Sequence, residues 1–115
     1  MDKVDREEIN VYSVIKSNGI CPGAAVISTA GHDKDRVYLV LDVKEKDAYL
    51  SDGRIRRAGN PKKKRVTHIK MLGMAEDPRY IRKIMQEISS EEEKDIEIRK
   101  ILSNFFKKGN EVKDV

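Results

Sequence analysis

The sequence has no tryptophan, one cysteine and only six tyrosine and phenylalanine residues among its 115 positions. With 38% hydrophobic and 38% charged residues, the chain is expected to have a thin core and a densely charged surface. Large apolar cavities are difficult to line from such a composition, so a buried enzyme pocket is not expected. The length allows one compact domain with a short extension and excludes two full-sized domains.

The single cysteine, Cys21, rules out an internal disulfide, so a secreted, disulfide-stapled scaffold is not expected. The first residues, Met-Asp-Lys-Val-Asp-Arg-Glu-Glu, lack the basic start and apolar run of a signal peptide. No stretch approaches the roughly 18 consecutive apolar residues of a membrane span. These absences predict a soluble, cytoplasmic protein with no membrane partner.

Patterns that carry catalysis or bind a metal are also missing. The sequence has no nucleophile elbow, Walker loop or Gly-x-Gly-x-x-Gly segment. The two histidines, His32 and His68, stand apart from each other and from Cys21, so no zinc-ligand spacing arises. The carboxylates fall mostly on expected helix faces, as solvating charges. We therefore expect no enzymatic activity, no metal and no cofactor.

The sequence does contain an uneven distribution of charge. Residues 23–72 carry twelve Lys and Arg against six Asp and Glu, whereas residues 1–22 and 73–115 each carry one more acid than base. Attraction to a polyanion depends on the density of cations within about a Debye length. The middle of the chain is therefore the candidate binding region, although the formal net charge is only +4.

This middle region consists of short runs rich in β-branched and aromatic residues, separated by polar turns, as in consecutive antiparallel strands. Asp52 and Gly53 suit a tight hairpin turn, because both of its central residues need positive φ. Five short strands in about 50 residues are too few for a two-layer sandwich but can curl into a small barrel. The predicted strands are residues 24–29, 36–43, 48–51, 54–57 and 66–71.

After Gly73 the apolar period changes from two residues to 3.6, which predicts two amphipathic helices. Asp77 before Pro78 predicts the N-cap of the first, and Ser90 with Glu93 predicts a capping box for the second. Their apolar stripes are Ile81, Ile84, Met85 and Ile88, and then Ile98, Ile101, Leu102 and Phe105.

The densest group of cations is the segment 54–65, which has seven cations in twelve residues and no carboxylate. Gly59, Asn60 and Pro61 predict that its last four residues leave on a loop. A polyanion would relieve the repulsion among these charges, and its binding would weaken steeply with salt. The flanking strands favour nucleic acid over a membrane surface, which an amphipathic helix would bind. A solvated loop that only aids solubility is the remaining alternative.

A second polar segment, residues 28–36, lies between the first two predicted strands. Gly31 indicates a position with positive φ, and Asp33 is expected to stabilise the turn through its own backbone. Residues 23–43, an apolar strand, the turn Ala-Gly-x-Asp-Lys-x-Arg and a second apolar strand, resemble the KOW motif. Together with Pro-Lys-Lys-Lys-Arg-Val-Thr-His at 61–68, they are similar to bacterial KOW-domain RNA-binding proteins related to eukaryotic-type large-subunit ribosomal proteins. Members of that family commonly have Arg and Gly at the positions of His32 and Asp35.

The resemblance covers residues 20–72 and implies an SH3-like β-barrel that binds RNA in a ribosomal or translation-linked setting, without a cofactor. The expected architecture is mainly β with α: an N-terminal extension (residues 1–19), the KOW barrel (20–72) and a C-terminal helical segment (73–115). A short apolar patch at residues 9–15 fits either a helical turn or an edge strand. The expected partners are RNA, in particular ribosomal RNA, and the ribosome; the oligomeric state does not follow from the sequence.

Phosphate contacts are expected from the basic segment and from residues that extend its patch. His32 is expected either to contact RNA or simply to be exposed to solvent. His68 is expected either to have a structural role or to contact a phosphate. Tyr38 and Tyr49 either stack on unpaired bases or fill the core. With so few aromatic residues, recognition of the backbone and shape of folded RNA is favoured over readout of individual bases. The expected cationic contacts are Arg54, Arg56, Arg57, Lys62, Lys63, Lys64 and Arg65, extended by Lys34, Arg36 and Lys70.

The two apolar stripes suggest a second class of function, because together they present more apolar surface than a small barrel can cover. The barrel or the helices would then dock on a translation or transcription component. The competing expectation is that the helices pack on each other and on the barrel.

Overall fold

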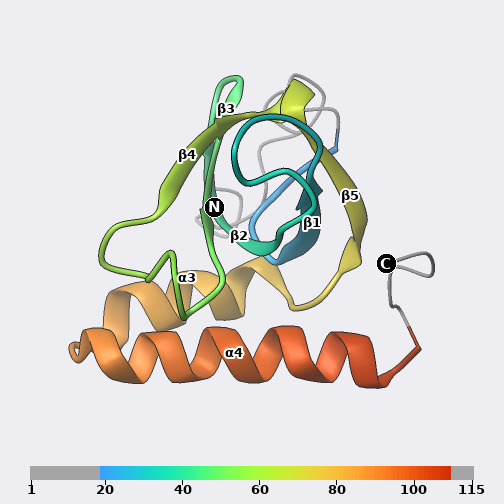
Figure 1. Cartoon of the computed structure of the whole chain (residues 1–115). Coiled ribbons are helices and arrows are strands. Elements are labelled where there is room, and N and C mark those ends of the chain that lie inside the picture. The colour runs from blue at the N-terminus through green and yellow to red at the C-terminus, as the bar shows by residue number, and fades with distance from the viewer. Residues whose placement is uncertain (1–18, 110–115) are drawn as a thin grey trace, which may run out of the picture.

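The computed structural model describes residues 19–109, which form a five-stranded antiparallel sheet and two α-helices (Figure 1). The apolar patch noted at residues 9–15 lies outside the described residues. The strands are β1 (Ala24–Ser28), β2 (Val37–Lys44), β3 (Asp47–Ser51), β4 (Lys62–Arg65) and β5 (Ile69–Met74), with the 3-10 turn η1 (Val66–His68) before β5; the helices are α3 (Pro78–Glu87) and α4 (Glu91–Lys107).

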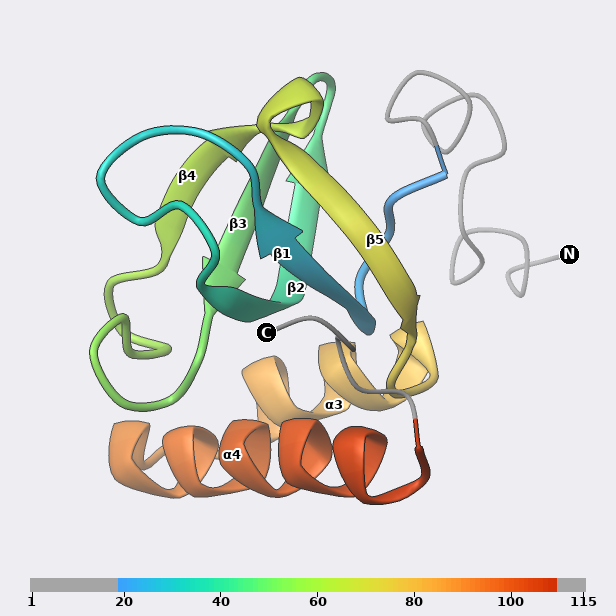
Figure 2. The same ribbon diagram turned by 45° about the vertical axis from the view of Figure 1, so that its right-hand side comes forward.

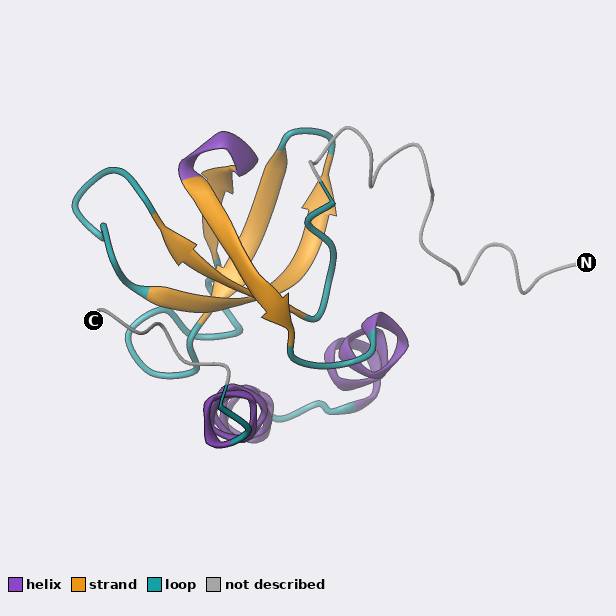
Figure 3. Ribbon diagram, turned by 90° about the vertical axis from the view of Figure 1, so that its right-hand side faces the viewer, coloured by secondary structure: helices purple, strands orange, loops and turns teal. Residues whose placement is uncertain are grey.

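The strands follow the order β4-β3-β2-β1-β5, so the last strand returns to pair with the first. All four pairings are antiparallel. The sheet curls, and β5 crosses over the other strands (Figures 2 and 3). Its edge strands β4 and β5 are joined by η1 but are not paired, so the sheet is not closed. The predicted combination of antiparallel strands with two C-terminal helices is confirmed.

Residues 38–41 of strand β2 are buried on both faces of the sheet, which explains the continuous apolar run at the start of this strand. Because side chains alternate along a strand, Tyr38 and Val40 face the concave side of the sheet, where they pack with residues such as Val26 and Leu50. Leu39 faces the opposite side, toward the helices. The sheet therefore separates two apolar clusters.

Helices α3 and α4 lie together against the convex face of the sheet (Figures 1 and 2). Both predicted N-caps are confirmed: the Arg79 backbone N–H donates to the Asp77 carboxylate over 2.7 Å, and that of Glu93 donates to Ser90 Oγ over 3.2 Å. The apolar stripes of the two helices pack on the sheet and on each other. This agrees with the expectation of internal packing and not with that of a docking surface. Most of the residues that suggested a docking surface are thus buried, and Met85 and Ile88 are partly buried against the same cluster.

The predicted strand at residues 54–57 is wrong, because these residues form a loop and β4 begins only at Lys62. The Asp52 carboxylate accepts hydrogen bonds from the backbone N–H groups of Arg54 and Arg56, and these bonds fold the chain into a turn. Ile55 is left 70% exposed at the tip of this loop.

Candidate nucleic-acid interface

Asp33 organises the loop between β1 and β2. Its side chain is buried and accepts three hydrogen bonds, from Ser28 Oγ (2.9 Å), Tyr38 Oη (2.7 Å) and Lys64 Nζ (2.7 Å). The predicted positive φ of Gly31 is confirmed at 89°. The role expected for Asp33 was local, whereas its carboxylate joins β1, β2 and β4.

The protonation states of this cluster follow from its contacts. Burial alone would raise the pKa of the Asp33 carboxyl, but the hydrogen bonds from Lys64, Tyr38 and Ser28 and the charge of Lys64 hold that pKa well below its usual range. Burial and the bond to Asp33 raise the pKa of the Tyr38 hydroxyl. Asp33 therefore stays ionised and Tyr38 stays a donor at neutral pH. Tyr38 fills the core, which decides between its two expected roles.

The four consecutive cations of β4 divide between two faces, because they form a strand and not the predicted loop. Lys64 points inward: its side chain is only 9% exposed, and its Nζ also donates to the Ala30 carbonyl over 2.8 Å. Lys63 and Arg65 lie on the other face, more than 60% exposed, beside the Asp47 carboxylate at 3.9 and 3.5 Å. Lys64 thus holds the fold together, and the outward charge of β4 is smaller than its sequence suggests.

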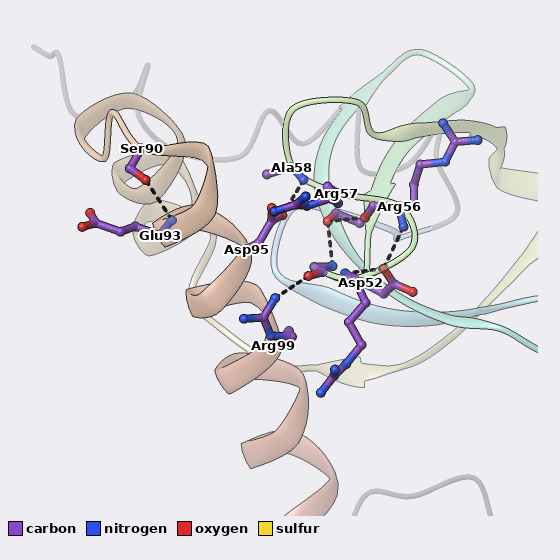
Figure 4. Close-up of polar contacts among 11 residues, drawn as sticks. Asp52, Arg56, Arg57, Ala58, Ser90, Glu93, Asp95 and Arg99 are labelled. Carbon is purple, nitrogen blue, oxygen red and sulfur yellow. Dashed lines mark hydrogen bonds and ion pairs between the residues drawn. The ribbon is translucent and has the colours of Figure 1, made fainter.

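The loop that follows β3 is held from within by short polar side chains (Figure 4). The Arg56 carbonyl accepts from Ser51 Oγ (2.8 Å) and from the Asp52 backbone N–H (3.0 Å). The Arg56 guanidinium donates to the Asn60 carbonyl over 3.3 Å. The loop is therefore pre-shaped, with the Arg54 side chain exposed on its outside.

Helix α4 also holds this loop, through Asp95 and Arg99 (Figure 4). Asp95 is fully buried and accepts from the Ala58 backbone N–H (2.7 Å) and from Arg57 Nε (2.9 Å). Arg99 donates to the Gly53 carbonyl over 2.6 Å. Gly53 has φ 74°, and a Cβ there would lie 2.6 Å from the Asp95 carbonyl oxygen. The sequence analysis does not single out Asp95, because it expects most carboxylates to be solvating charges on helix faces. Asp95 lies three and seven residues before Ile98 and Leu102, on the buried stripe of α4.

The remaining predicted contacts lie on the β1–β2 loop and beside it. His32, Lys34 and Arg36 are exposed on that loop. The side chains of His68 and Lys70 are also exposed. Their backbone lies beside β1 and the residue that follows it, because the Thr29 N–H donates to the His68 carbonyl and Lys70 pairs with Ile27.

These segments form one continuous side of the molecule. The β1–β2 loop, β4 and residues 52–61, which we call the basic face, lie next to one another in Figure 2, and the contact of Lys64 with Ala30 joins the first two. On this face Lys34, Arg36 and Arg54 are exposed, and they have no carboxylate within 4.0 Å in residues 19–109; the same holds for Lys70 at its margin.

One exposed acid lies on the basic face. Asp35 has φ 76°, the left-handed conformation that glycine adopts without strain. It occupies the position at which members of the resembled family commonly have glycine. The turn thus keeps a left-handed residue there, and the carboxylate lowers the local positive potential.

No group of three or more His, Cys, Asp and Glu side chains within 19–109 could hold a metal ion. Cys21 is buried, which raises the pKa of its thiol. No helix between residues 19 and 109 combines the length and apolar character that a membrane crossing requires. The chain matches no protein-family model and no curated protein.

Asp33→Asn should lower the free energy of unfolding at neutral pH by about 3 kcal/mol, because it leaves Lys64 without its buried counter-charge. A carboxyl whose pKa is depressed by folding adds stability above its unfolded pKa of about 4, and this stability is lost as pH falls below that value. The wild type should therefore lose stability below about pH 4, and the variant should lose less. Urea unfolding across pH measures both effects. Asp47→Asn, at the more exposed ion pairs, is the control and should cost under about 1 kcal/mol; equal losses in the two variants would contradict the assignment.

Asp95→Ala should lower the free energy of unfolding by about 2 to 4 kcal/mol, because it orphans the Ala58 N–H and unpairs Arg57. Glu92→Ala, an exposed position of the same helix, should change it by less than about 1 kcal/mol. Limited proteolysis should also cut the Asp95 variant first within residues 52–61. A variant with wild-type stability and an uncut loop would show that Asp95 does not hold this loop.

Proposed function

We propose that this protein binds RNA through the basic face, and that its curled sheet is an SH3-like barrel of the KOW type. The observation that carries the proposal is that the acidic and the basic side chains of the basic face are placed differently. The buried carboxylates of Asp33 and Asp95 and the half-buried carboxylate of Asp52 accept hydrogen bonds that hold the loops. In contrast, Lys34, Arg36 and Arg54 are exposed and have no carboxylate partner within 4.0 Å in the described residues.

This arrangement favours a polyanion over a role in solubility alone. A loop that only aids solubility does not need a buried carboxylate on a helix to fix its shape, as Asp95 does for residues 52–61. A fixed set of cations binds phosphates at a lower entropic cost than a flexible one. Neutralised phosphates would release their counterions, so affinity would fall steeply with salt.

RNA is proposed as the polyanion because residues 23–43 and 61–68 resemble the KOW family. The proposed setting is cytoplasmic and linked to the ribosome or to translation, with ribosomal RNA as the preferred partner. The outward residues are cations, with few aromatic rings beside them, which supports contact with the phosphate backbone of folded RNA as the main source of affinity.

Neutralising the three unpaired cations tests this proposal. Lys34→Gln, Arg36→Gln and Arg54→Gln together should weaken binding to a structured RNA by tenfold or more at moderate salt and reduce the slope of log affinity against log salt by about 2 to 3. Fluorescence anisotropy across a salt series gives both quantities. The matched control neutralises Lys83, Lys100 and Lys107, exposed on the helices, and so changes the net charge equally.

The control variant should bind within about threefold of the wild type, because charges farther than a Debye length are screened. Equal weakening of both triple variants would show that net charge alone attracts RNA. Wild-type affinity that does not change with salt would contradict phosphate contact altogether.

Removing the negative charge of Asp35 gives a second test, in which RNA binding should become tighter and not weaker. Asp35→Asn removes the charge but keeps a side chain that tolerates positive φ, so it should raise RNA affinity about threefold by removing repulsion. Asp35→Gly should raise affinity equally and also raise the free energy of unfolding by about 1 kcal/mol, because glycine has no steric penalty there. Anisotropy and thermal unfolding measure the two effects. Lower affinity in both variants would mean that the Asp35 carboxylate takes part in binding.

A further inference from the structure

A pocket of about 360 Å³ lies between β2, β3 and helix α3, beside the basic face. Tyr49 from β3, Met85 from α3 and the rings of Pro61 and Pro78 line it, with Lys44 and Arg82 among its charged residues. Its volume is near the lower end of the roughly 300 to 1,000 Å³ of small-ligand pockets. A single flat group of nucleobase size suits such a site better than an extended ligand.

We infer that this pocket takes one unpaired nucleobase of the bound RNA, stacked on Tyr49. The inference rests on the proposed function, since the base would belong to the RNA held by the basic face. It also decides between the two roles expected for Tyr49, which is half-buried at the pocket and is not a member of either apolar cluster.

The position of Tyr49 connects the pocket to the cations of β4. Tyr49 lies directly opposite Lys63 in the β3–β4 register, and Pro61 immediately precedes that strand. Lys63 is exposed on the face that Tyr49 shares, because paired residues of neighbouring strands point to the same side. A nucleotide with its base in the pocket would therefore have a cation beside its phosphate.

Lys44 adds a second cation, in the lining of the pocket. Its Nζ lies 5.7 Å from the centroid of the Tyr49 ring, close to the outer limit of about 6 Å for a cation–π contact. At this distance the ammonium is held weakly, and it is free to pass to the phosphate of an entering nucleotide while the base takes the ring face.

The charges and walls of the pocket favour a base over a peptide. Two cations, Lys44 and Arg82, line it with one acid, Asp42, which suits a base that is attached to an anionic phosphate. Grooves that bind proline-rich peptides need several aromatic walls, and this pocket has Tyr49 as its one aromatic residue. Stacking on one ring is sufficient for a nucleobase and tolerates any base.

Two RNA probes test the inference: a stem with a tail of about five unpaired nucleotides that includes 2-aminopurine, and the same stem without the tail. The wild type should bind the tailed RNA about tenfold more tightly and quench 2-aminopurine fluorescence through stacking. Tyr49→Thr should remove both the preference and the quenching while leaving the binding of the blunt stem unchanged. Tyr49→Phe keeps the ring and should behave as the wild type.

A further variant and a peptide probe distinguish failure of this inference from misfolding and from another ligand. Lys44→Gln, at an exposed position, should weaken only the tailed RNA, about threefold to tenfold, which guards against misfolding of the Tyr49→Thr protein. Equal binding of the two stems by the wild type, or unchanged quenching in Tyr49→Thr, would overturn the inference and leave the proposed function standing. Binding of neither RNA by the wild type would overturn the proposed function itself. Saturable binding of a proline-rich peptide that Tyr49→Thr removes would overturn the nucleobase as occupant.

Discussion

The buried ion pair between Lys64 and Asp33 is the contact on which the basic face depends. Its 2.7 Å bond ties the edge strand β4 to the β1–β2 loop, and the bonds from Ser28 and Tyr38 complete the shell of the carboxylate. Strand β4 has little apolar surface to bury, so backbone pairing and this pair hold it in place. The sheet places β4 and the ends of the β1–β2 loop, and the pair adds the direct contact that fixes the loop against β4.

Asp95 has the same role at the other end of the face. It supports residues 52–61 from helix α4, far along the chain, whereas Asp33 supports the β1–β2 loop from within that loop. Each carboxylate is desolvated and offset by a cation and by hydrogen bonds, so each costs more if its partners are removed than a surface pair would. The two acids pair with two of the cations, Lys64 and Arg57, whereas the exposed cations of the face include Lys34, Arg36 and Arg54.

Local patterns predicted the helices and most of the sheet. The caps at Asp77 and Ser90, the apolar stripes and the runs of β1, β2 and β3 depend on residues close in sequence, and they were found as expected. Strand β4 was missed because an all-cationic strand at a sheet edge has no apolar alternation. Burial of Lys64 depends on Asp33, 31 residues away, and that of Asp95 on Arg57, 38 residues away, so neither follows from local pattern.

Mapping of amide chemical shifts during a titration with a structured RNA tests most directly the central claim that inward carboxylates leave an outward cationic surface that binds RNA. The largest changes should fall in the β1–β2 loop, β4 and residues 52–61, and the solvent side of α3 and α4 near Lys83 and Lys100 should stay unchanged. Shifts concentrated on those helices, with the basic face unaffected, would contradict the claim.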